Sequence, residues 1–270
     1  MGRIEESFRR LREGGELGLI AYLTVGYPTL EAIFRLVPAV LAGGAHMVEL
    51  GIPFSDPLAD GATIQRATQV ALAQGVRPRT CLEVVRRLRA QGVEAPLVLM
   101  TYFNPLLALG VEPFLREARD AGADGIIVVD LPWEEGEEVR KACQAVGLDL
   151  IPLVAPTTED ERLARIGREA QGFIYCVSVT GVTGARDELP PDLPQLLKRV
   201  RAHTPLPIAV GFGISKRKHL EVVRPLADAV VIGSAIVERL EGATPEEAAE
   251  RVRSYVEVVT GRRAQDPLYG

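Results

Sequence analysis

Short, almost continuously apolar runs alternate along the chain with longer segments in which hydrophobic residues recur every three or four positions. The runs are rich in β-branched residues and end at Gly, Pro, Asp or Asn, which is typical of parallel strands covered on both faces. Eight strands are predicted: 17–25, 47–52, 97–102, 125–130, 148–154, 172–179, 207–211 and 229–233.

The segments between these strands carry helical periodicity. Helices are predicted at 30–42, 62–74, 80–91, 113–121, 134–146, 159–169, 193–202, 216–224 and 245–259, with one more amphipathic helix, 4–11, before the first strand. Thr158, Ser215 and Thr244 are placed to cap helix starts, and Gly122 and Gly147 are placed to end helices. Each strand is therefore followed by at least one helix.

Eight strand–helix units predict a (β/α)₈ TIM barrel, of class α/β, with an extra N-terminal helix. The alternative is a doubly wound open sheet, but the first strand leads into Val-Gly-Tyr-Pro at 25–28 and not into the Gly-x-Gly-x-x-Gly of a dinucleotide fold. No linker, low-complexity tract or block of like charge divides the sequence. We therefore expect residues 1–270 to form a single domain.

Composition narrows the classes of partner. The formal net charge of −5 gives no broad cationic surface, which argues against nucleic acid or an anionic membrane as a partner. The first residues are acidic where a signal peptide would be basic and then apolar, and no apolar stretch is long enough to span a bilayer. Cysteines 81, 143 and 176 are far apart, which suggests neither disulfides nor a zinc cluster. We expect a cytoplasmic protein.

In a TIM barrel the functional groups lie at the carboxyl ends of the strands. Gly-Phe-Gly-Ile-Ser at 211–215 follows the seventh predicted strand, and Gly-Ser-Ala at 233–235 ends the eighth and opens into a helix. Such glycines let main-chain N–H groups approach an anion closely, so these loops favour a phosphate monoester over ordinary tight turns. A third glycine-rich loop, 178–184, follows the sixth strand and suits a mobile lid.

Three acids lie at or just beyond the second strand. Glu49 interrupts an otherwise apolar strand, so it is either a structural ion pair with an Arg or a general acid/base with a raised pKa, and its place near the strand end favours the second. Asp56 and Asp60 follow in the loop 53–61. Ordinary turn chemistry would explain Asp56, and Asp60 could be the N-cap of the next helix.

The remaining reactive residues restrict the chemistry. The three histidines, at 46, 203 and 219, do not gather at strand ends, so no metal site is expected. All four lysines fall in helical segments, which leaves no candidate for a Schiff base, and no nucleophilic triad is visible. A phosphate site with carboxylates therefore predicts proton transfers to a substrate that supplies its own electron sink.

One motif identifies a family. The stretch Val-Glu-Leu-Gly-Ile-Pro-Phe-Ser-Asp-Pro-Leu-Ala-Asp-Gly at 48–61, followed by Thr-Ile-Gln at 63–65, closely resembles the signature of the tryptophan synthase α subunit family. The segments 181–184, 211–215 and 233–236 match the same family in order and spacing, so that the resemblance covers nearly the whole chain.

The resemblance implies retro-aldol cleavage of indole-3-glycerol phosphate to indole and glyceraldehyde 3-phosphate, with no cofactor in this chain. Glu49 would transfer protons, and Asp60 would interact with the indole N–H. The other substrate-contacting positions would be Tyr22, Met100, Tyr102, Val129, Leu153, Tyr175, Thr183 and Phe212. The phosphate-binding positions would be Gly184, Gly213, Gly233 and Ser234. For Met100, Val129 and Leu153, plain barrel core is nearly as good an explanation.

The family also implies a partner, a pyridoxal-phosphate β subunit in an α2β2 complex, which would receive the indole and make L-tryptophan. Pro53 and Asp56 would lie at that interface, and docking there would press the lid 178–186 closed. Tyr22 stands where Phe is common in the family. Two alternatives remain: another phosphate-binding barrel enzyme such as phosphoribosylanthranilate isomerase, which would lack the long loop 53–61, and a non-catalytic subunit that only activates a partner.

Overall fold

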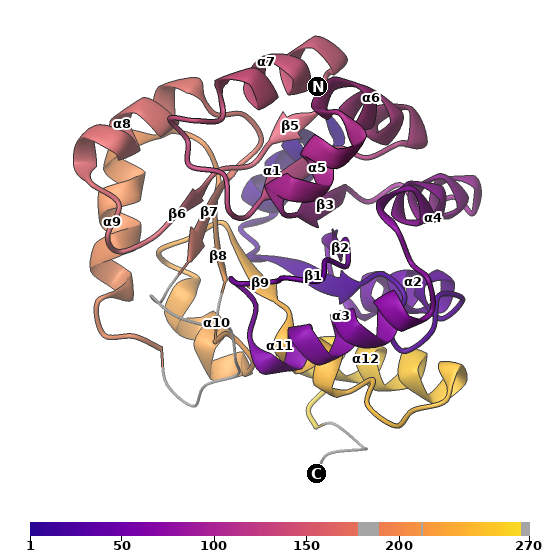
Figure 1. The fold of residues 1–270 in the computed structure, drawn as a ribbon. Coiled ribbons are helices and arrows are strands. Elements are labelled where there is room, and N and C mark those ends of the chain that lie inside the picture. Colours follow the sequence, from indigo (N-terminus) through magenta and orange to yellow (C-terminus); the bar gives the residue numbers. More distant parts are fainter. Residues whose placement is uncertain (178–188, 212, 266–270) are drawn as a thin grey trace.

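The computed structural model describes residues 1–177, 189–211 and 213–265, and these form one parallel sheet surrounded by helices (Figure 1). The strands are β1 (Gly18–Thr24), β2 (Met47–Gly51), β3 (Leu97–Thr101), β4 (Gly125–Val128), β5 (Asp149–Leu150), β6 (Leu153–Val154), β7 (Ile174–Val177), β8 (Ile208–Gly211) and β9 (Ala229–Ile232). Their order in the sheet is β5-β4-β3-β2-β1-β9-β8-β7-β6.

Helices surround the sheet, and all except the first follow a strand and cover the outside of the sheet (Figure 1). They are α1 (Arg3–Gly14), α2 (Ile33–Gly43), α3 (Ala62–Ala73), α4 (Pro78–Ala90), α5 (Phe103–Leu109), α6 (Val111–Ala121), α7 (Glu137–Val146), α8 (Asp160–Glu169), α9 (Leu193–His203), α10 (Arg217–Val223), α11 (Ser234–Glu238) and α12 (Pro245–Val259). The short helix α5 was not predicted. None of the helices within the described ranges has the length and apolar character needed to cross a membrane.

The two edge strands of the sheet, β5 and β6, both come from the fifth predicted strand. The predicted strand 148–154 is divided into β5 and β6, because Pro152 has no N–H to donate to a ladder. On one side of this break the N–H of Ile151 donates to the carbonyl of Ile126 at 2.9 Å, and on the other the N–H of Tyr175 donates to the carbonyl of Pro152 at 3.0 Å. The two ends of the sheet are thus consecutive in the chain, and the predicted (β/α)₈ barrel is confirmed.

Helix α1 covers the amino-terminal end of the barrel. It inserts Ile4, Phe8 and Leu11 among the inward-facing side chains of the strands, and all three are buried. Glycines make room for it: a Cβ at Gly18 would lie 2.7 Å from Leu11 Cδ1, and one at Gly125 would lie 3.1 Å from Ile4 Cδ1. The extra N-terminal helix expected from the sequence is therefore part of the barrel core.

Three of the predicted helix ends are confirmed. Thr244 Oγ1 accepts from the N–H of Glu247, and the Glu247 carboxylate accepts from the N–H of Thr244 at 2.9 Å, which forms a capping box at the start of α12. Gly122 and Gly147 end α6 and α7 in the left-handed conformation.

The predictions for Thr158 and Ser215 were wrong. The N-caps of α8 and α10 are Glu159 and Lys216, each one residue later. Thr158 Oγ1 instead accepts from the N–H of Ala155 at 2.9 Å, so its hydroxyl closes the turn that precedes the helix. A local turn competes with a cap for the same hydroxyl, and the sequence does not distinguish between them.

Two acids tie neighbouring strands together at the amino-terminal end. Asp124, just before β4, accepts from the N–H of Leu97 at 2.8 Å and from Arg89 Nη2 at 2.5 Å. Half a barrel away, Asp228 just before β9 accepts from the N–H of Ile208 at 2.8 Å and from Arg201. Arg89 lies on α4, which precedes β3, and Arg201 lies on α9, which precedes β8.

We expect Asp124→Ala to lower the free energy of unfolding by about 3 kcal/mol, because it removes the counter-charge of the largely buried Arg89 guanidinium and the acceptor of the Leu97 N–H. Asp120→Ala, an exposed acid on α6, should change it by less than ~0.5 kcal/mol. Urea denaturation monitored by circular dichroism measures both. A loss below ~1 kcal/mol for Asp124→Ala would show that the strand tie contributes little.

Candidate active site

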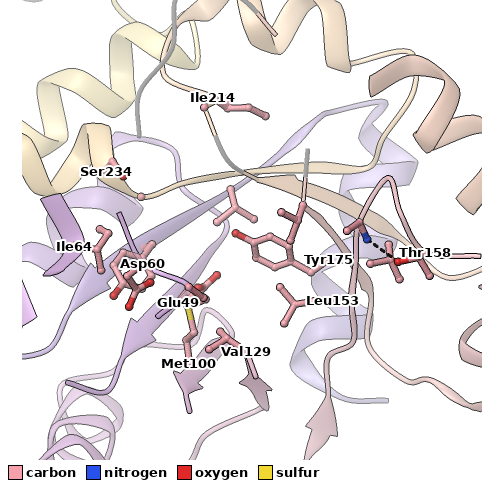
Figure 2. Close-up of a pocket in the computed structure, with 18 of the residues that line it drawn as sticks. Glu49, Asp60, Ile64, Met100, Val129, Leu153, Thr158, Tyr175, Ile214 and Ser234 are labelled. Atoms are coloured by element: carbon pink, nitrogen blue, oxygen red, sulfur yellow. Dashed lines mark hydrogen bonds between the residues drawn. The ribbon is translucent and has the colours of Figure 1, made fainter. Parts of the chain in front are cut away.

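A cavity of about 390 Å³ opens at the carboxyl ends of the strands (Figure 2). The predicted residues that line it are Tyr22, Glu49, Asp60, Met100, Val129, Leu153, Tyr175, Gly213, Gly233 and Ser234. Figure 2 shows Glu49 and Tyr175 in the middle, with Met100 and Val129 on the opposite side from Ile214. Thr183, Gly184, Phe212 and the expected lid 178–186 lie outside the described residues.

Glu49 is held on β2 with its carboxyl inside the barrel. It lies opposite Tyr22 of β1 and Val98 of β3 in the parallel register, and it is 1% exposed. Its Oε2 has no hydrogen-bond partner among the described residues, and no described cation forms an ion pair with it. Burial, assisted by the negative charge of Asp60, raises the pKa of Glu49 to about 8. Among the described residues no arginine forms the ion pair, and a pKa of about 8 leaves Glu49 mostly protonated at neutral pH.

Asp60 reaches the same cavity from the loop after β2. Tyr102 Oη donates to Asp60 Oδ2 at 3.1 Å and accepts from the N–H of Ala59 at 3.1 Å. Burial raises the pKa of Asp60 to about 6, and the bond from Tyr102 limits that rise. The N-cap of α3 is Gly61, so the interpretation of Asp60 as a helix cap is wrong.

Tyr102 has a different place from the one predicted. It is not among the residues that line the cavity but stands behind Asp60, where the ring of Phe54 packs against it with 5.3 Å between centroids. Its hydroxyl thus joins the loop 53–61 to the end of β3 and orients the Asp60 carboxylate. From the sequence alone, an aromatic residue at a strand end is equally consistent with a pocket wall and with a residue that supports a neighbouring side chain.

Two glycines at strand ends admit the phenols of the cavity, a role that sequence reasoning missed. A Cβ at Gly51 would lie 2.2 Å from Tyr22 Oη, and one at Gly211 would lie 2.3 Å from Tyr175 Oη. Thr24 Oγ1 also donates to Tyr22 Oη at 3.3 Å. Burial raises the pKa of both tyrosines well above the usual value, so both phenols stay protonated. A glycine at an inward strand position is the available signal for such close contact.

The glycine-rich turns after β8 and β9 form another part of the wall. Gly213 has a φ of +81°, a conformation that favours glycine, and Gly233 leads into α11, which begins at Ser234. Both glycines and Ser234 face the cavity that holds Glu49 and Asp60. The two loops expected to hold phosphate are thus brought to one site with the carboxyl pair.

The loop after β6 extends the cavity, which the sequence reasoning did not anticipate. Thr157 and Thr158 of this loop line the cavity together with Arg162 of α8, whose Nε also donates to Glu134 Oε1 at 2.7 Å. Their position just beyond a strand end is the only signal that could have identified them.

Within the ranges that the structure describes, no group of three His, Cys, Asp or Glu side chains could hold a metal ion.

The two residues predicted for a partner interface differ in exposure. Pro53 is buried, whereas Asp56 is exposed and its carboxylate accepts a hydrogen bond from the hydroxyl of Ser55. Neither lines the cavity. Leu58 in the same loop is 88% exposed, which leaves an apolar side chain in water beside Asp56.

Comparisons with known proteins cover nearly the whole chain. The family model described as tryptophan synthase alpha chain matches residues 8–264. The tryptophan synthase alpha chain of Roseiflexus sp. (strain RS-1) is 51% identical over 261 residues, which cover 97% of this chain and 100% of the relative. That of Chloroflexus aggregans is 52% identical over 256 residues, with 95% and 96% covered.

Solved structures show the same architecture. A tryptophan synthase structure from Mycobacterium tuberculosis has a chain 37% identical to this one, with a TM-score of 0.87 and coverage of 96% of this chain and 97% of that one. A protein from Aquifex aeolicus VF5 is 38% identical, with a TM-score of 0.88 and coverage of 97% and 98%. Family model, relatives and fold agree, so this chain belongs to the tryptophan synthase alpha chain family.

Proposed function

We propose that this chain cleaves indole-3-glycerol phosphate to indole and glyceraldehyde 3-phosphate, a carbon–carbon lyase reaction of the retro-aldol type. The observation that carries the proposal is the buried Glu49 carboxyl, which faces a cavity and lacks a described partner, and whose pKa is raised to about 8 by that burial. A second carboxyl, Asp60, and the glycine-rich turns after β8 and β9 face the same cavity. This reaction needs a general acid, a negative charge near the indole N–H, and hydrogen-bond donors for the phosphate.

The reaction needs one proton moved from an oxygen to a carbon. Glu49 gives its proton to indole C3, which makes the ring an iminium-like electron acceptor. The resulting Glu49 carboxylate takes the proton of the side-chain hydroxyl next to the ring. The carbon–carbon bond then breaks, its electrons restore the indole, and the hydroxyl carbon becomes the aldehyde of glyceraldehyde 3-phosphate. Ionised Asp60 stabilises the positive charge that develops at the indole N–H.

Binding divides between a polar and an apolar part of the cavity. Main-chain N–H groups at Gly213 and Gly233, with the Ser234 hydroxyl, receive the phosphate, together with Gly184 of the family motif. The indole ring packs against a set of apolar and aromatic side chains. That set is Tyr22, Met100, Val129, Leu153 and Tyr175. The family motif assigns Phe212 to the same apolar part and Thr183 to the lid over the ring. A volume of about 390 Å³ is within the usual range for small-molecule sites.

The product suggests a partner, because indole is small and apolar and would escape by diffusion unless it were handed on. We propose that this chain joins a β subunit in a cytoplasmic α2β2 complex, in which pyridoxal phosphate belongs to the partner and this chain needs no cofactor. The loop 53–61 supports this role, since it exposes Asp56 and Leu58 beside the cavity. We expect neither nucleic acid nor a membrane as a partner.

The direct test is to incubate the purified chain with indole-3-glycerol phosphate and measure indole. Glu49→Gln should lower kcat by at least about 10²-fold, because the amide has nearly the same volume but cannot shuttle a proton. Glu250→Gln, an exposed glutamate on α12, is the matched control and should keep full activity. Turnover by Glu49→Gln within tenfold of the wild type would remove Glu49 from the proton transfer.

The same variant has a stability readout. Because the pKa of Glu49 is raised to about 8 in the folded chain, the folded chain keeps a proton that the unfolded chain loses above pH 4.5. The stability of the wild type should therefore fall between about pH 4.5 and 8, and Glu49→Gln should lack this part of the decline. Urea denaturation at both pH values separates loss of chemistry from loss of fold.

The pH dependence follows from the two carboxyls. Asp60 must be ionised and Glu49 protonated, so kcat/KM should rise with pH through about 6 and fall through about 8. Tyr102→Phe removes a hydrogen bond that favours ionised Asp60, and should move the lower limb upward by roughly half to one pH unit. Asp60→Asn should lose most activity and this limb with it. A lower limb that stays in place in Tyr102→Phe would separate Asp60 from that ionisation.

The interface proposal has its own test. Asp56→Ala should reduce the acceleration of indole release by the β subunit, while the activity of the isolated chain stays within about twofold, because Asp56 lies outside the cavity. Asp120→Ala on α6 is an exposed-acid control and should leave the acceleration intact. An equal loss with and without the β subunit would place Asp56 in the site of this chain and not at the interface.

A further inference from the structure

A buried side chain of the outer shell holds the loop after β8. Tyr255 of α12 is 3% exposed, and its Oη donates to the carbonyl of Ser215 at 2.8 Å. The N–H of Ser215 donates to Nδ1 of the buried His219 on α10 at 3.2 Å. Both main-chain polar groups of this residue are thus held by side chains from helices, two positions after Gly213. Neither of these two side chains is among the residues that line the cavity.

The same tyrosine also supports the turn after β9. The guanidinium carbon of Arg239 lies 3.6 Å from the centroid of the Tyr255 ring. Arg239 follows the last residue of α11, and its Nη1 donates to the carbonyl of Ala235 at 2.7 Å. Ala235 is the residue after Ser234 and also lines the cavity. Through Arg239, the tyrosine ring is therefore connected to the first turn of α11.

We infer that Tyr255 is a positioning residue for the phosphate of the substrate, an inference that rests on the proposed function. Its hydroxyl holds one phosphate loop and its ring supports the other, so that a single side chain sets the spacing between Gly213 and Ser234. A phosphate bound by both loops needs donors at hydrogen-bond distance on two sides at once, which makes its affinity sensitive to that spacing. Tyr255 itself touches neither the cavity nor the carboxyl pair.

The test is Tyr255→Phe, which removes the bond to Ser215 and keeps the ring under Arg239. The inhibition constant of glycerol 3-phosphate and the KM for indole-3-glycerol phosphate should each rise by about three- to tenfold, with kcat within about twofold. Tyr255→Leu, which removes the ring as well, should raise both further. Arg239→Lys keeps the charge but loses the planar stack and the fork, and should act in the same direction as Tyr255→Phe.

Two controls separate positioning from general packing. Affinity for indole, which has no phosphate, should be unchanged in Tyr255→Phe, because the apolar wall lies on other strands. Tyr27→Phe removes the hydroxyl of a half-buried tyrosine outside the cavity lining and should alter neither constant. If Tyr255→Phe lowers Tm but leaves the inhibition constant of glycerol 3-phosphate within twofold, the residue only packs and the inference is overturned.

A third variant distinguishes failure of this inference from failure of the proposed function. Gly213→Asp places a carboxylate beside the proposed phosphate and should abolish inhibition by glycerol 3-phosphate. Inhibition lost in Gly213→Asp but unchanged in Tyr255→Phe would leave the phosphate site standing and remove Tyr255 from it. A wild-type chain that glycerol 3-phosphate does not inhibit would overturn both.

Discussion

The burial of the Glu49 carboxyl without a described partner is the constraint on which the proposed chemistry of this barrel depends. Removing a carboxylate from water costs several kcal/mol, and here the cost appears as a raised pKa. Asp124 is also buried, but Arg89 and a strand N–H pair with it. The two acids lie at opposite ends of parallel strands. Paired acids at the amino ends hold the strands together, and the unpaired acid near the carboxyl ends is available for proton transfer.

Glycines on the strands make room for larger side chains at both ends of the barrel interior. At the amino-terminal end, Gly18 and Gly125 make room for helix α1. At the other end, Gly51 and Gly211 make room for the phenols of Tyr22 and Tyr175, which then lie beside an open cavity and not in a filled core. The same residue type thus closes one end of the barrel and shapes a ligand site at the other. A glycine at the start of a strand makes room for helix α1, and a glycine at the end of a strand makes room for a phenol of the cavity.

Much of the fold and the carboxyl pair could be predicted from the sequence, because both depend on local patterns. Apolar runs mark strands, and Glu49 is conspicuous as a charge inside one of them. What could not be predicted depends on contacts between distant segments. Tyr102 orients Asp60 from behind, and Thr158 closes a turn in place of capping a helix. The break at Pro152 is visible in the sequence, but its effect appears only when β4 and β7 are seen to pair on either side of it.

Strand order also determines how a substrate would lie. β1 pairs with β2 on one side and with β9 on the other, so Tyr22 stands between the two functional parts of the cavity. Its ring lies over Gly51 on the side of the carboxyls, and a Cβ at Gly233 would lie 3.5 Å from Tyr22 Cβ on the side of the phosphate turns. A molecule with its phosphate at Gly233 and its ring against Met100 must cross this strand. Such a molecule would extend past Glu49, the only carboxyl that a described strand contributes to the lining of this cavity.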